Sequence, residues 1–172
     1  MELNPNKSDA IVLGTRQRSA SYSSFTLVAV AGVSTISLAD HIKVLGITLD
    51  KHLTFDDHVN LVSKSAFYHI QVMRHIRSAL TEDMAKTVAC ALVGVRLDYA
   101  NCVLVGVTTK NVARLQRAQN AVAQVVAWGS NRQSTSSSAL LKHYHWLPIH
   151  QRIQFKIACI TYKTTTLLSL LI

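Results

Sequence analysis

Short apolar runs set the first 52 residues apart from the rest of the chain. Three runs of strand length end near glycine or serine, and they are Ala10–Leu13, Phe25–Val30 and Val44–Leu49. Runs of this kind predict a small antiparallel sheet. Gly46 lies inside the third run, where a glycine indicates a bulge or a close approach of another backbone. The polar, Ser-rich segment Arg16–Ser24 is expected to be a loop.

From residue 53 the apolar positions recur every three or four residues, which is the spacing of one helix face. A first helix should begin at a capping box of Thr54 and Asp57 and run to about Leu80. A second should follow Thr81, whose hydroxyl suits an N-cap, and continue to Gly106. The expected inner face of the first helix is Val59, Val62, Ala66, Ile70 and Met73, and that of the second is Met84, Val88, Leu92 and Val95.

The same spacing predicts a third helix over Lys110–Trp128, which Gly129 ends. The polar stretch 130–138 should be a linker, a short helix is expected around Ala139–His143, and a last helix should start near Pro148. The inner residues are Leu115, Ala118, Val122 and Val125 in the third helix, and Ile149, Ile153, Ile157 and Ile160 in the last. The pattern therefore predicts an α+β fold, mainly α, divided into residues 1–52, 53–129, 130–138 and 139–172.

Positive charge is concentrated in the helical part. Residues 1–60 hold five Lys or Arg and six Asp or Glu, a sum of −1, whereas residues 61–172 hold thirteen and three, a sum of +10. No acidic residue follows Asp98. A folded segment with this bias repels itself unless a polyanion is near, which favours nucleic acid over an anionic membrane surface as the partner. On charge alone, a merely soluble basic surface stays the alternative.

Two features of the termini bear on location. The longest apolar runs, around 25–33 and 167–172, are too short to span a bilayer, and the N-terminus has acidic and polar residues where a signal peptide would be apolar. We therefore expect an intracellular protein with no membrane partner. The apolar, uncapped end at 167–172 also leads us to expect a piece of a larger protein.

The residues that could carry chemistry form no complete catalytic or metal site in the sequence. Asp56 and Asp57 are paired carboxylates, as a two-metal polymerase site needs, but their place at a helix start favours capping. His143 and His145 have no third ligand at a diagnostic spacing, so no metal site is expected. The three cysteines are far apart, which predicts buried, reduced thiols at Cys90, Cys102 and Cys159.

Basic residues recur at helical spacing on three of the predicted helices. Lys110, Arg114 and Arg117 stand at i, i+4 and i+7, opposite the apolar face, where such a stripe can follow a phosphate backbone. One such stripe is usually a solvated face, but three without interleaved acids favour nucleic-acid contact. The shorter groups are Arg74 with Arg77, and Arg152 with Lys156 and Lys163.

Four stretches of the chain resemble, in order, the reverse transcriptases of non-LTR (LINE-type) retrotransposons, and most closely the Jockey/CR1-like elements. LNPNKSD at 3–9 resembles the family's LNPxK(T/S)(E/D) motif, and VLGITLD at 44–50, with LTF at 53–55 and His58, resembles its LGVxLD…LxFxxH segment. RLDYANC at 96–102, with Gly106 and RLQRAQNA at 114–121, resembles its RLDYCN…YG…RLQRxQNAAAR stretch. HWLP at 145–148, QRIQFK at 151–156 and TYK at 161–163 resemble its LHWLPxxxRIxFK…TYK signature.

The resemblance implies a role for each part of the chain. Residues 1–52 would hold the end of the palm and a primer-grip hairpin, 53–129 thumb-like helices, 130–138 a Ser-rich linker, and 139–172 a truncated helical segment. Lys7 would be the motif D acid that protonates the leaving pyrophosphate. Together with the basic stripes, the resemblance gives the candidate nucleic-acid-binding residues: Gly46, Arg74, Arg77, Lys110, Arg114, Arg117, Arg152 and Lys156.

One departure from the family limits the expected activity. The Tyr-x-Asp-Asp sequence that binds the catalytic Mg²⁺ would precede residue 1 and is not in this chain, nor are the fingers or most of the palm. We therefore expect an RNA-directed DNA polymerase fragment that holds an RNA/DNA template–primer beside the missing palm and fingers, has no cofactor of its own and is inactive alone. Within the full element protein its location would be nuclear. A host-used helical interaction module without polymerase function is the alternative.

Overall fold

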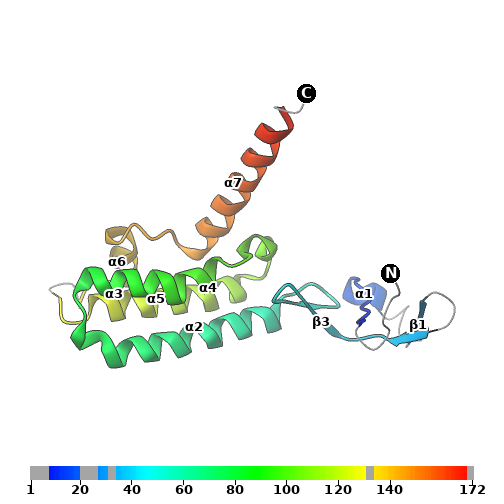
Figure 1. Ribbon diagram of the computed structural model, residues 1–172, viewed down its shortest axis with the longest axis horizontal. Helices are drawn as coiled ribbons and strands as arrows, with labels where there is room; N and C mark the ends of the chain where they lie inside the picture. The colour runs from blue at the N-terminus through cyan, green and yellow to red at the C-terminus, as the bar shows by residue number, and fades with distance from the viewer. Residues whose placement is uncertain (1–7, 20–26, 31–33, 131–133, 170–172) are drawn as a thin grey trace. The chain divides into compact units, whose positions relative to one another are not determined.

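The computed structural model describes residues 8–19, 27–30, 34–130 and 134–169 (Figure 1). The chain divides into two compact units, residues 1–58 and 59–172. The described residues are mainly helical with a few short antiparallel strands, which confirms the predicted α+β, mainly α class.

The described part of the first unit contains two antiparallel hairpins and one turn of helix, α1 (Arg16–Ser19). Strand β1 (Leu27–Val30) pairs with β2 (Ser34–Ser37), and β3 (His41–Val44) pairs with β4 (Ile47–Asp50). The register of the second pair sets the first residue of β3 opposite the last residue of β4.

The strand predictions were partly wrong. The run Ala10–Leu13 makes only a single parallel bridge, from Ala10 to Leu38, and Val12 and Leu13 are exposed instead of covered by a sheet. The run Val44–Leu49 is not one strand, because the chain reverses direction within it. Strands β2 and β3 were not predicted, since each is four residues long and mixes polar with apolar side chains.

The second unit holds most of α2 (Asp56–Ile76), whose buried face is largely the predicted one. Val59, Ala66, Ile70 and Met73 are fully buried there. The helix ends earlier than expected and passes into a 3₁₀ turn, Arg77–Ala79.

Helix α3 (Glu82–Ala89) begins at Thr81 as predicted, because the Thr81 hydroxyl accepts a hydrogen bond from the backbone N–H of Met84 at 3.3 Å. It continues through a π-helical turn, Cys90–Gly94, into α4 (Val95–Asp98), and a 3₁₀ turn, Asn101–Leu104, follows. The predicted inner face was wrong by one residue or more: Ala85, Ala89, Val93 and Leu97 are buried, whereas Met84 and Val95 are more than half exposed. Buried positions that recur every four residues would drift around an ordinary α-helix, and the wider π turn keeps them on one side.

Helix α5 (Thr109–Ala127) forms the centre of the second unit. It contacts α3, α6 (Ser137–His143) and α7 (Ile149–Ser169), and Figure 1 shows α3 beside it and α7 running away from the other helices. Its predicted inner residues are all buried. Gly129, at φ +75°, adopts the left-handed conformation that commonly ends a helix. Helix α7 is buried only at its start, since Ile149 and Ile153 are covered but Ile160 is 45% exposed.

The thiols differ from the prediction as well. Cys90 is exposed and Cys102 and Cys159 are half-buried, so none of the three is a fully buried thiol. Cys90 follows Ala89, and it is the alanine that takes the inward position at the start of the π turn.

Candidate nucleic-acid interface

The tip of the β3–β4 hairpin is a two-residue turn formed by Leu45 and Gly46. Their φ angles are +48° and +82°, and Val44 pairs directly with Ile47 across them. Two successive positive φ values in such a loop are typical of a type I′ turn, whose twist matches the flanking strands. Gly46 was expected inside a strand and is instead the second turn residue, where both residues are exposed.

The base of this hairpin is held by Asp50. Its carboxylate accepts hydrogen bonds from the backbone N–H groups of His52, Thr54 and Phe55 at 3.0, 3.0 and 2.7 Å, and from the Thr54 hydroxyl at 3.2 Å. Burial alone would raise the pKa of Asp50, but these hydrogen bonds to the charged form outweigh it, so its pKa lies below the ordinary 3.8. The carboxylate thus fixes the chain between β4 and α2.

Two further contacts join the hairpin to the start of α2. His58 is buried, its Nδ1 accepts a 3.4 Å hydrogen bond from the backbone N–H of Thr48, and burial lowers the pKa of its imidazole from 6.5. Asp57 lies 3.2 Å from Nδ1 of His41. His58 and Asp50 both belong to the stretch that resembles the retrotransposon family, and each has an internal structural role here.

The three α5 cations point along one side of the helix. Lys110 and Arg117 are exposed, and Arg114 is half-buried. At about 100° per residue, this stripe lies roughly a quarter turn from the buried side chains and not opposite them, which explains the partial burial of Arg114. The three side chains form the longest run of predicted contact residues on one element.

Arg77 has a different place from the one expected. It is buried, and its guanidinium donates to the carbonyls of Val125 (3.1 Å), Val126 (2.8 and 3.2 Å) and Leu80 (2.7 Å). Two of these carbonyls belong to the last turn of α5, where the helix itself supplies too few N–H donors. The carbonyl of Val125 also accepts the backbone N–H of Trp128 at 3.2 Å. The structure therefore gives Arg77 a helix-capping role in place of the expected nucleic-acid contact, whereas Arg74, one turn earlier, is exposed.

Arg152 is also engaged within the protein. Its Nη1 lies 2.6 Å from Oδ2 of Asp98, its Nε donates to the carbonyl of Leu147 at 2.9 Å, and its side chain is 17% exposed. This ion pair ties the start of α7 to the end of α4. Lys156 and Lys163, farther along α7, are exposed. Of the third predicted basic group, the two lysines thus face solvent and the arginine is mostly occupied.

A network of amide side chains on α5 was missed by the sequence analysis. Gln116 donates to Gln119 and Asn120 and accepts a 2.9 Å hydrogen bond from the N–H of Ile149, the first residue of α7. Gln119 is fully buried and donates to the carbonyl of Leu147 at 2.8 Å. The signal was present in the sequence, because three amides at i, i+3 and i+4 share one helix face.

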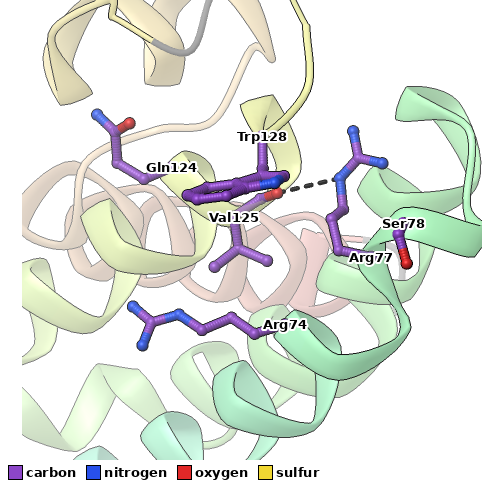
Figure 2. A pocket seen from close by; sticks show the side chains of 6 residues that line it. All are labelled: Arg74, Arg77, Ser78, Gln124, Val125 and Trp128. Atoms are coloured by element: carbon purple, nitrogen blue, oxygen red, sulfur yellow. Dashed lines mark hydrogen bonds between the residues drawn. The ribbon is translucent and has the colours of Figure 1, made fainter.

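A pocket of about 570 Å³ lies at the C-terminal end of α5 (Figure 2). It is lined by Arg74, Arg77, Ser78, Gln124, Val125 and Trp128. Trp128 is 62% exposed. Neither Gln124 nor Trp128 was a predicted contact residue, since Trp128 was considered only as the end of a helix.

Two predictions concern metals and catalysis. Lys7 lies outside the described residues. Within the ranges 8–19, 27–30, 34–130 and 134–169, no three His, Cys, Asp or Glu side chains gather closely enough to hold a metal ion.

No protein-family model, curated protein or solved structure that was compared with the chain matches it. Along the described ranges, none of the helices combines the length and the apolar character that crossing a membrane requires.

Proposed function

We propose that this chain holds the template–primer nucleic acid of a non-LTR retrotransposon reverse transcriptase and does not itself carry out nucleotide transfer. The observation that carries the proposal is the line of Lys110, Arg114 and Arg117 along one side of α5, in a part of the chain with a net charge of +10. The ordered resemblance of four stretches supports the same conclusion. A cationic helix side of this kind suits a phosphate backbone, which carries one negative charge per residue.

The contacts between the resembling stretches add support. Asp98, from the RLDYAN stretch, pairs with Arg152, from the QRI stretch, and Gln116 and Gln119, from RLQRAQN, bond the backbone beside Pro148. The stretches are far apart in sequence but contact one another in the second unit. That is the behaviour expected of motifs that belong to one folded domain.

The test is binding to a labelled RNA–DNA hybrid duplex over a series of salt concentrations. We expect affinity to fall steeply with salt, and the variant Lys110→Glu/Arg114→Glu/Arg117→Glu to lose most of it. The slope of log K against log salt should decrease by about 0.9 for each lost phosphate contact, or about three in all.

A matched control makes the same change in total charge at other positions. The variant Lys64→Glu/Arg96→Glu/Lys142→Glu makes the same formal charge change at three other exposed positions of the second unit. If both triple variants lose the same affinity, binding follows net charge and not the α5 stripe, and the proposal is refuted.

The isolated chain should incorporate no labelled nucleotide in a primer-extension assay. The reaction needs paired carboxylates that hold two metal ions, and the family's Tyr-x-Asp-Asp sequence is not in the chain. Incorporation that depends on the chain would contradict the division of roles proposed here.

A further inference from the structure

The pocket at the end of α5 presents a large aromatic ring to solvent from a fixed position. Trp128 caps α5, its backbone N–H bonding the carbonyl of Val125 at 3.2 Å, and Gly129 turns the chain away behind it. Beside it, Arg77 is fixed by the carbonyls of Val125 and Val126. An exposed indole on a rigid wall is a surface on which a flat group can stack without ordering the protein first.

Gln124 forms another fixed part of the wall. Its amide donates to the carbonyl of Thr135 at 3.1 Å and to the Ser137 hydroxyl at 3.4 Å, which ties the wall to the start of α6. Val125 of α5 and the C-cap residue Trp128 complete this side of the pocket.

A cation faces the ring across the pocket. Figure 2 shows the Trp128 indole on one side of Val125 and the Arg74 side chain on the other. Arg74 is exposed, and Nη1 makes a long 3.4 Å hydrogen bond to Gln71. Most of its N–H donors therefore face solvent. An aromatic face next to a planar, charged donor group is the pair that a nucleotide requires, one for the base and one for the phosphate.

The basic stripe of α5 leads to this pocket. Positions 110, 114, 117, 121, 124 and 128 follow one another at spacings of four and three, so they stay within about 80° on the helix. From Lys110 to Trp128 the helix rises about 27 Å, the length of roughly eight nucleotides stacked at about 3.4 Å each. The cations and the aromatic pocket are thus parts of one side of α5.

We propose that this pocket receives an unpaired nucleotide of a single-stranded nucleic acid, with the base stacked on Trp128 and the phosphate bound by Arg74. This strand continues into the duplex whose backbone the α5 stripe follows. The inference rests on the proposed function, because both take nucleic acid as the partner. It goes beyond that function by assigning a site for a single strand next to the duplex, built from Trp128, Gln124 and Arg74.

The experiment compares a fluorescently labelled twelve-residue oligothymidylate with the same strand in which every base is replaced by an abasic residue. The two strands have equal charge, so a difference in affinity measures the contribution of the bases to binding. We expect the thymidylate to bind more tightly, Trp128→Ala to weaken it by roughly 5- to 150-fold, the range typical of one stacked base, and Trp128→Phe to keep part of the affinity. Arg74→Ala should weaken both strands.

Matched controls and a second readout accompany these variants. Tyr68→Ala removes another exposed aromatic ring, on α2, and should leave both affinities unchanged. Trp128 is exposed whereas Trp146 is 9% exposed, so quenching of the exposed fluorescence by thymidylate and not by the abasic strand reports stacking directly. Far-UV circular dichroism confirms that each variant remains helical.

The inference is overturned if the abasic strand binds the natural chain as tightly as thymidylate, or if Trp128→Ala weakens both strands equally. An apolar peptide or detergent that quenches Trp128 while oligonucleotides do not would assign the pocket to another partner and also overturn it. The hybrid duplex, measured with the α5 triple variant, separates the two proposals. If the α5 triple variant loses duplex binding while Trp128→Ala leaves single-strand binding unchanged, the proposed function is supported and only this inference is refuted.

Discussion

Replacement of Arg77 tests whether this arginine stabilises the fold or contacts a ligand. In the structure its guanidinium makes four hydrogen bonds to three carbonyl oxygens, two of them at the C-terminal end of α5. Arg77→Ala would leave the carbonyls of Val125, Val126 and Leu80 without these donors. It would also remove a positive charge from the negative end of the helix dipole.

The magnitude follows from those contacts. A hydrogen bond to a charged partner contributes about 1.5–3 kcal/mol, and a cation at a helix C-terminus contributes about 0.3–1 kcal/mol. Arg77 and Val125 both line the pocket. In the alanine variant we therefore expect water to replace part of the lost hydrogen bonding, so that the contributions do not add in full. We expect Arg77→Ala to lower the free energy of unfolding by about 2–4 kcal/mol. Arg77→Lys should lose about half of that, because lysine keeps the charge but lacks the planar fork.

The assay is urea unfolding followed by circular dichroism at the helical minimum. With a slope of about 2 kcal/mol per molar urea, a loss of about 3 kcal/mol moves the midpoint down by roughly 1.5 M. Arg74→Ala is the control, since the exposed arginine one turn earlier should change stability by less than about 0.5 kcal/mol. Equal midpoints for the two variants would refute the capping role. A folded Arg77→Ala protein of normal stability that no longer binds the hybrid duplex would instead support the original prediction that Arg77 contacts nucleic acid.

Three further changes test other parts of the structure. Leu45→Asn should stabilise the β3–β4 hairpin by about 0.5–1 kcal/mol, because asparagine tolerates positive φ better than leucine. Slower exchange of the Ile47 amide, which lies opposite Val44 across the turn, would show it, and unchanged exchange would not fit a type I′ turn. Asp50→Asn should destabilise the first unit by about 1–2 kcal/mol at pH 7. Because the folded pKa of Asp50 lies below 3.8, the charged carboxylate stabilises the protein above pH 3.8, and this contribution is lost as the pH falls through the folded pKa. Thermal unfolding of the natural protein and of Asp50→Asn, measured from pH 7 downward, should therefore show the difference in stability decreasing. A difference that stays constant with pH would contradict this. A double-mutant cycle of Asp98→Asn and Arg152→Gln should give a coupling of about 0.5–1 kcal/mol that decreases with salt, as suits a partly exposed pair, and zero coupling would mean that the contact does not hold α7.

The sequence was sufficient to predict the elements whose signals are local. Apolar periodicity and capping chemistry were enough to predict the Thr81 N-cap, most of the inner face of α2, the inner face of α5 and its end before Gly129. The π turn at Cys90–Gly94 could not be predicted in this way. It adds one residue to a helical turn without a sequence signal, so the inward position after it is Leu97 and not the predicted Val95. The errors at Met84 and Val88 come before the turn, because the small Ala85 and Ala89 are buried there in place of the larger apolar side chains.

Positions that depend on distant contacts were predicted less well. Arg77 looked like a member of a solvated basic pair, and only its contact with the end of α5, 48 residues later, turns it into a cap. Arg152 is similar, because its acidic partner Asp98 lies 54 residues earlier. The spacing of charges along one helix does not reveal which of them a second helix covers. The same limit hid the pocket at Trp128, because its lining combines the end of α5 with Arg74 from α2.

The residues that resemble the retrotransposon family therefore divide into two groups with different value as evidence of function. Internal hydrogen bonds explain one group, which is Asp50, His58, Asp98, Gln119 and Arg152. These residues stabilise the fold and are no evidence for a ligand. The exposed cations at 110 and 117 have no comparable internal role among the described contacts, and a solvated helix side tolerates many other residues in their place. Nucleic-acid binding is consequently tested by replacing exposed side chains and comparing the affinity with that of control variants of equal charge. A variant of the internal residues that lost binding would report only the loss of the scaffold.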